Sequence, residues 1–370
     1  MWRRWVGRAP TGVDRVCLAY LERYRQSAHA VIQHPRMRRI LDGRSSAALF
    51  DLLAGPTNFR RALISSALRV GLLRSCDAKG RFYLNVGHTG LNDAGFKTWV
   101  RNANVRPLYL VHDLIPITHP EYCRVGESTK HRQRMLTVLD TAVGVIGNSL
   151  STLDDLRRFA TAEGRSLPPV LSAPLGSDVL PPPGPTSSGP ARPTFVILGT
   201  IEARKNHLML LQIWRRMVQK LGTAAPRLLV IGQRGWECEQ VLDLLDRSEL
   251  LKGSVMEIGR CDDAALAGYL AEARALLFPS LVEGYGLPLM EALGAGVPVI
   301  ASDLPVFREI VGDIPDYIDP LDAPAWERTI LSYAQSGSAH RDAQLQRLGS
   351  FRPPTWNDHF NAVEGWTATL

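Results

Sequence analysis

The chain has 370 residues, and its 45% hydrophobic and 21% charged content is typical of soluble globular proteins, which excludes a fibrous or disordered chain. This length predicts two domains, and no apolar run approaches the length that a membrane span needs. The net charge of +7 is uneven, since residues 1–180 hold 26 Lys and Arg against 14 Asp and Glu, whereas residues 181–370 hold 17 against 22. We therefore expect an anionic partner for the first half, with solvated surface arginines as the alternative.

The five cysteines are scattered, and no pair has the spacing of metal ligands, so we expect no disulfide framework and no metal site built on them. The start of the chain is basic, but no apolar segment of the kind found in a secretory signal follows it. These features predict a cytoplasmic protein.

The first predicted elements surround a short loop over residues 10–15, which carries Gly12 and precedes an apolar-periodic helix. A plain helix N-cap is the alternative interpretation of this loop. Residues 28–33 are predicted as a strand. Residues 58–74 are predicted as an amphipathic helix, because apolar side chains recur on one side and arginines lie elsewhere.

The strand Arg106–Val111 ends in His112 and Asp113. An imidazole and a carboxylate at the carboxyl end of a strand face the crevice of an open sheet, where ligands bind. A capped strand end with a structural histidine is the alternative. Three other histidines have no comparable placement and are interpreted as structural: His88, His119 and His131.

The first half then continues as helix 127–140, strand 142–146, helix 151–159 with Ser149 as its N-cap, and strand 170–174. Residues 181–190 are so rich in proline and glycine that neither a helix nor a strand can form. This segment is the clearest domain boundary in the chain.

The second domain is predicted to start with the strand Thr194–Leu198 and a loop that carries Gly199, Arg204 and Lys205. Two fixed cations beside free backbone amides would neutralise a diphosphate and stabilise it as a leaving group. A basic helix start is the alternative, but cations oppose the helix dipole at that end.

Strands and helices then alternate regularly, which predicts a doubly wound parallel sheet. The expected strands are Arg227–Ile231, Val255–Ile258, Ala275–Phe278 and 297–301, and the expected helices are 238–250, 263–273, 288–293 and 356–369.

The most informative segment, residues 275–302, combines a buried strand, a glycine loop, a helix start at Pro288 and a second strand. Unpaired backbone amides and the helix dipole at such a loop favour an anion. Two carboxylates, Glu283 and Glu291, flank the loop. A phosphate would repel them, so sugar hydroxyls are their natural partners, and phosphate plus diols describes a nucleotide sugar. The alternative is a helix-capping loop with two surface glutamates.

The nine residues Glu283-Gly-Tyr-Gly-Leu-Pro-Leu-Met-Glu291 resemble the E-x7-E signature of the retaining glycosyltransferases of family 4. That family has the GT-B fold, an α/β architecture of two Rossmann-like doubly wound domains that face a central cleft. The resemblance implies that Glu291 holds the ribose of the donor and that Glu283 lies beside the donor sugar. The loop amides would hold the diphosphate, at Gly284, Tyr285, Gly286 and Leu287.

Other residues receive their expected roles from the same resemblance. Arg204 and Lys205 would bind the diphosphate, as would Gly12 from across the cleft. His112 would contact the donor sugar and, with Asp113, the acceptor. The expected catalytic residues are thus His112, Glu283, Arg204 and Lys205, and further donor contacts are expected at Gly199, Gly259, Arg260 and Cys261.

We therefore expect an acceptor-binding domain over residues 1–180, a linker over 181–193 and a donor-binding domain over 194–354, with a final helix over 355–370 packing back on the first domain. The expected reaction moves a hexose, with mannose from GDP-mannose favoured, to a saccharide or lipid-linked saccharide acceptor in cell-surface polysaccharide synthesis. No metal and no cofactor is expected, because no Asp-x-Asp element lies at a strand end.

The charge of the first half and the amphipathic stretch 58–74 also predict docking on an anionic membrane surface, with Arg36, Arg38 and Arg39 in support. Packing of that stretch on the sheet is the alternative.

Two other functions are weighed. A nucleotide-sugar epimerase would need no acceptor, and a nucleic-acid-binding protein would leave both glutamates unexplained and lacks an aromatic and basic platform.

Overall fold

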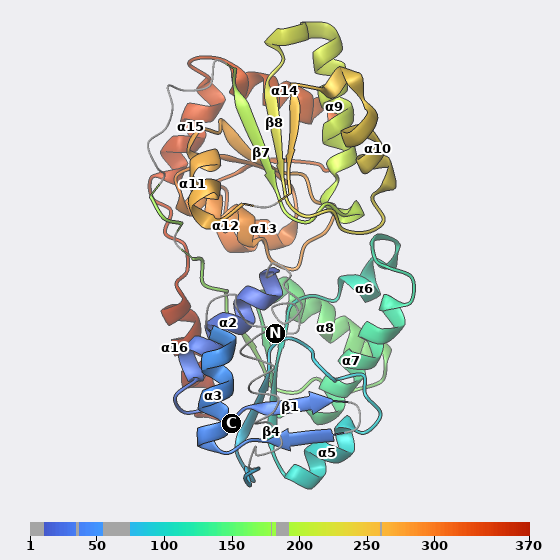
Figure 1. Ribbon diagram of the computed structural model, residues 1–370, viewed down its shortest axis with the longest axis vertical. Coiled ribbons are helices and arrows are strands. Elements are labelled where there is room, and N and C mark those ends of the chain that lie inside the picture. Colours follow the sequence, from blue (N-terminus) through green and yellow to red (C-terminus); the bar gives the residue numbers. More distant parts are fainter. Residues whose placement is uncertain (1–10, 35–36, 55–74, 179, 183–191, 260) are drawn as a thin grey trace.

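The computed structural model describes residues 11–34, 37–54, 75–178, 180–182, 192–259 and 261–370. Figure 1 shows two α/β parts, one built on each of two parallel sheets, with the chain crossing between them twice. The predicted helix over 58–74, Arg36, Arg260 and most of the predicted linker lie outside the described residues.

The first sheet is parallel, with strand order β3-β4-β5-β6. The two central strands, β4 and β5, consist mainly of buried residues, as expected for a sheet covered on both faces. Its strands are β3 (Phe82–Asn85), β4 (Arg106–Val111), β5 (Gly144–Gly147) and β6 (Val170–Ser172). Its helices are α2 (Gly12–Tyr24), α3 (Gly43–Ala54), α5 (Phe96–Ala103), α6 (Ile115–Thr118), α7 (Glu127–Thr141) and α8 (Leu150–Ala162).

The strand predicted over 28–33 is only part of an antiparallel pair, β1 (Val31–His34) with β2 (Met37–Ile40). The sequence between the two lacks the Asn-Gly or Asp-Gly signal that reveals a tight hairpin.

Arg38 of β2 was expected to support membrane docking, and the structure corrects this expectation. Its side chain is 7% exposed and bonds Asp93 at 2.8 Å. It is therefore not free to contact a membrane surface.

The second sheet is also parallel, with strand order β12-β11-β10-β7-β8-β9. The order reverses between β7 and β10, which makes this pair the topological switch point where ligands bind in open α/β sheets. Its strands are β7 (Thr194–Leu198), β8 (Arg227–Ile231), β9 (Val255–Ile258), β10 (Ala275–Phe278), β11 (Val299–Ser302) and β12 (Asp316–Ile318). Its α-helices are α9 (His207–Leu221), α10 (Glu239–Arg247), α11 (Asp263–Ala271), α12 (Leu287–Gly294), α13 (Pro305–Val311), α14 (Ala323–Ala334) and α15 (Ala339–Leu348).

The last helix, α16 (Trp356–Thr367), lies beside α2 of the first part (Figure 1). Tyr20 of α2 bonds His359 at 2.8 Å and packs edge-on against Phe360, with ring centroids 5.1 Å apart. One apolar cluster runs from these residues through the first sheet to α12 and α13, so the two parts share buried contacts. The domain boundaries stay a prediction. None of the helices in the described ranges combines the length and apolar character that crossing a membrane requires.

Candidate functional site

The site is built where the loops after the neighbouring strands β7 and β10 meet. The β7 loop leads into the 3-10 turn Ala203–Lys205, and the β10 loop leads into α12, whose N-terminus begins after Gly286. The two loops are tied together, because the amide of Leu281 donates to the carbonyl of Arg204 at 2.8 Å. Gly286 has a φ of 133°, a conformation that glycine adopts without strain, and Pro288 lies in the first turn of α12.

Glu283 pairs with both predicted phosphate-binding cations. Arg204 donates to Glu283 at 2.7 Å, Lys205 forms a second ion pair with it, and Ser280 donates to it at 2.7 Å. The Glu283 side chain is only 7% exposed. Burial by itself would raise the pKa of Glu283, but the cations of Arg204 and Lys205 lower it to about 2. The carboxylate is therefore ionised at neutral pH. Its direct partners in this structure are the two cations, which hold its orientation.

In setting the pKa, burial outweighs the ion pair at Lys205, whereas at Glu283 the ion pairs outweigh burial. The Lys205 side chain is buried, and this burial lowers the pKa of Lys205 despite the ion pair with Glu283. Arg204 also bonds Glu202 at 2.6 Å, so the cluster holds two cations and two carboxylates. A diphosphate that enters this site would compete with Glu283 for both cations.

Glu291 lies in α12 and has a partner from the other domain. Arg15 of α2 forms an ion pair with it and bonds Asp178 at 2.8 Å. The Glu291 side chain is only 2% exposed, and burial raises its pKa although Arg15 opposes the shift. Sequence reasoning missed Arg15 as a site residue. The available signal was its position three residues after Gly12, in the loop predicted to face the donor phosphates.

The glycine loop contacts the first domain directly. A Cβ atom added to Gly284 would lie 2.6 Å from both Asp113 Cβ and the His112 carbonyl oxygen, so only glycine permits this approach. Tyr285 is buried, and its hydroxyl donates to the Leu175 carbonyl at 2.9 Å. The Tyr285 ring therefore packs between domains, and only its backbone remains for the predicted role.

His112 lies at the end of β4, as predicted, and burial lowers its pKa. Its Nε2 lies 2.7 Å from the Val86 carbonyl, which can only accept, so in the neutral ring Nε2 carries the proton and Nδ1 is the acceptor. His88 and His131, interpreted as structural, gather around it. The ring centroids of His88 and His112 are 5.5 Å apart, and those of His88 and His131 are 5.7 Å apart.

The other predicted residues divide into two groups. A Cβ on Gly12 would lie 3.4 Å from Leu287, so Gly12 adjoins the start of α12, and a Cβ on Gly199 would lie 3.8 Å from the Lys205 ammonium, so Gly199 adjoins the cluster. Gly259 and Cys261 follow the edge strand β9, and Cys261 packs against the apolar cluster that includes Tyr285. Their donor contacts stay a prediction.

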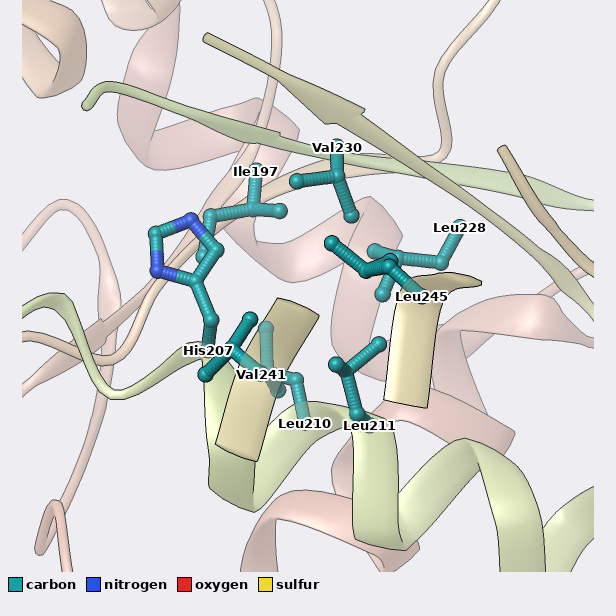
Figure 2. Close-up of a pocket in the computed structure, with 8 residues that line it drawn as sticks. All are labelled: Ile197, His207, Leu210, Leu211, Leu228, Val230, Val241 and Leu245. Carbon is teal, nitrogen blue, oxygen red and sulfur yellow. The ribbon is translucent and has the colours of Figure 1, made fainter. Parts of the chain in front are cut away.

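The cavity drawn in Figure 2 is separate from this site. It lies between β7, β8, α9 and α10, and aliphatic side chains line it apart from His207. Figure 2 shows the His207 ring beside Ile197 at one end of that lining. Burial lowers the pKa of His207 to about 3, so the ring is neutral at physiological pH and belongs to the core. Across the described ranges, no three His, Cys, Asp or Glu side chains are placed to hold a metal ion.

Comparison with solved structures identifies the architecture. HepE of Anabaena, solved in complex with UDP, superposes with a TM-score of 0.65 at 15% identity and covers 97% of both chains. Sucrose-phosphate synthase of Thermosynechococcus elongatus superposes with a TM-score of 0.56 at 20% identity, covering 92% of this chain and 84% of that one. The fold is GT-B.

Comparison with protein families and curated proteins finds similarity to glycosyltransferases. Residues 186–340 match the family described as glycosyl transferases group 1, which supports a glycosyltransferase. The O-antigen chain mannosyltransferase B of Escherichia coli is 34% identical over 161 residues, which are 44% of this chain and 42% of the relative. The serotype-specific mannosyltransferase WbdA of Escherichia coli is 29% identical over 231 residues, 57% of this chain and 28% of the relative. The chain thus spans less than half the length of either curated relative.

Proposed function

We propose that this GT-B protein is a retaining hexosyltransferase that moves a hexose, with mannose from GDP-mannose favoured, from a nucleotide-diphosphate sugar to a saccharide acceptor. The observation that carries the proposal is the meeting of Arg204, Lys205 and Glu283 at the switch point, beside the N-terminus of α12. Cations beside free helix amides suit a diphosphate, and an oriented carboxylate suits sugar hydroxyls. The relatives named as mannosyltransferases support the hexose and its use in polysaccharide synthesis.

In the proposed reaction the acceptor hydroxyl oxygen bonds the anomeric carbon while the bond from that carbon to the diphosphate breaks. The diphosphate leaves with the electron pair, and the acceptor proton passes to its phosphate oxygen, so no nucleophile of the protein is assigned. Arg204 and Lys205 would stabilise the charge that grows on the departing phosphate. His112, neutral and fixed by Val86, would accept a hydrogen bond from the donor sugar through Nδ1, while Asp113 faces the acceptor. No metal or cofactor is assigned a step.

Donor binding is tested by thermal denaturation with a panel of nucleotide sugars and nucleoside diphosphates. A ligand that binds only the folded protein raises its stability by about 2.7 kcal/mol at a concentration of 100 times Kd. We expect GDP-mannose and GDP to raise the melting temperature, with UDP-glucose as the runner-up. Unchanged melting with every member of the panel would contradict the proposed function.

The acceptor is proposed to be lipid-linked and reached at the cytoplasmic face of an anionic membrane. The +12 balance of residues 1–180 supports this, although Arg38 is engaged with Asp93. We expect sedimentation with liposomes that contain anionic lipid, and the bound fraction should fall as salt rises. Replacing Arg60 and Arg61 together by Glu should also reduce the fraction of protein that sediments with anionic liposomes. If the protein stays in the supernatant at low salt, the membrane-docking proposal is wrong and a soluble acceptor becomes the better choice.

A further inference from the structure

Arg15 is a first-domain residue whose guanidinium lies in the second domain's site. It reaches Glu291, the carboxylate proposed to hold the ribose. Gly12, where α2 begins, adjoins Leu287, where α12 begins, so the N-termini of the two helices meet. Arg15 and Glu291 each lie about one turn inside their helices, beside the loop whose free amides favour an anion.

Arg15 also has an anchor outside the donor site. Its Nη2 and Nε donate to Asp178 at 2.8 and 3.3 Å, and the indole of Trp356 donates to the other oxygen of Asp178 at 3.1 Å. The ion pair with Glu291 uses a different nitrogen, Nη1. Arg15 can therefore release Glu291 while it keeps Asp178.

The ion pair with Glu291 cannot persist when a ribose binds there. Glu291 is only 2% exposed, so hydroxyl groups reach it only if the guanidinium beside it gives way. A released guanidinium at this point faces the diphosphate loop, and its planar N–H groups match phosphate oxygens. The site's own cations, Arg204 and Lys205, both have Glu283 as a partner, so a further cation from the other domain adds attraction for a diphosphate.

We propose that Arg15 is a donor-binding residue, which exchanges Glu291 for the donor diphosphate and frees that carboxylate for the ribose hydroxyls. The exchange rests on the proposed function. It makes each domain supply a cation to the same diphosphate.

The test compares a nucleoside with its diphosphate. Isothermal titration of guanosine, GDP, uridine and UDP is run with the wild type, Arg15→Gln and Arg23→Gln. Arg23 is the matched control, because it is also on α2 and also pairs with a carboxylate. Its partner, Glu364, belongs to α16, so this ion pair lies away from the diphosphate loop. Since a hydrogen bond to a charged group is worth roughly ten- to hundredfold in affinity, Arg15→Gln should weaken diphosphate binding by about that factor.

Binding of the matching nucleoside should not weaken in Arg15→Gln, because the variant removes the group that competes with the ribose for Glu291. Retained nucleoside binding also shows that the variant is folded. Arg15→Lys should fall between wild type and Arg15→Gln for the diphosphate, because it keeps the charge but not the planar fork. Equal losses for nucleoside and diphosphate, or no loss for either, would overturn the role of Arg15 and leave a purely interdomain ion pair. A wild type that binds neither GDP nor UDP would instead overturn the proposed function itself.

Discussion

Replacing Lys205 by Ala is expected to lower kcat by about 10²–10³-fold, while the affinity for the nucleotide sugar changes less than tenfold. The reason is that charge on the diphosphate grows as its bond to the sugar breaks, so a fixed cation stabilises the transition state more than the ground state. Lys205 is buried beside Glu283, where a low dielectric strengthens this interaction. The measurement is steady-state kinetics of nucleoside-diphosphate release at saturating acceptor.

Lys220→Ala is the control for that experiment. Lys220 is an exposed lysine of α9, paired with Glu327 at 3.1 Å, and its loss should leave kcat unchanged. The fold should survive Lys205→Ala, because Glu283 keeps Arg204 and Ser280 as partners. A variant with normal kcat and only a raised KM would show that Lys205 binds the donor without acting on the leaving group.

Replacing Glu291 by Ala is expected to weaken nucleotide binding about ten- to hundredfold, as for other lost hydrogen bonds to a buried charge. The loss should come from the ribose, so it should affect nucleoside and diphosphate alike, unlike the loss in Arg15→Gln. In the wild type, a 2′,3′-dideoxy nucleotide should bind about as weakly as the normal nucleotide binds to Glu291→Ala. Isothermal titration of both ligands with both proteins measures the coupling free energy between the ribose hydroxyls and the Glu291 carboxylate.

The matched control is Glu364→Ala, which removes a carboxylate that is also paired with an arginine but lies at α16. It should leave both affinities unchanged. If the folded Glu291→Ala protein still prefers the ribose nucleotide over its dideoxy form by the wild-type factor, the assignment of Glu291 to the ribose is wrong.

Sequence reasoning located most of the second domain because its signals are local. Buried strands such as Ala275–Phe278 read as short apolar runs, and the glycine loop, Pro288 and the two glutamates mark a helix start beside an anion site. The regular alternation of strands and helices was sufficient to predict a doubly wound sheet, and the GT-B neighbours confirm it.

What the sequence left out depends on contacts between distant segments. Arg15 and Glu291 are separated by more than half of the chain. The loop at Gly12 could have marked Arg15 as a site residue, but the sequence alone does not show that it pairs with Glu291. The pairing of Glu283 with both Arg204 and Lys205 likewise depends on β7 and β10 being neighbours, which strand order alone decides. The antiparallel pair β1–β2 was missed in part because its turn carries no standard hairpin signal.

The most direct test of the account is proton NMR of the purified protein with GDP-mannose, followed in time with and without an α-mannoside acceptor. We expect a new glycosidic linkage only when the acceptor is present, with the anomeric configuration of the donor retained and one GDP released per linkage. An inverted linkage would contradict retention. Conversion of the donor sugar into another sugar without any acceptor would contradict the transferase and favour an epimerase on this fold.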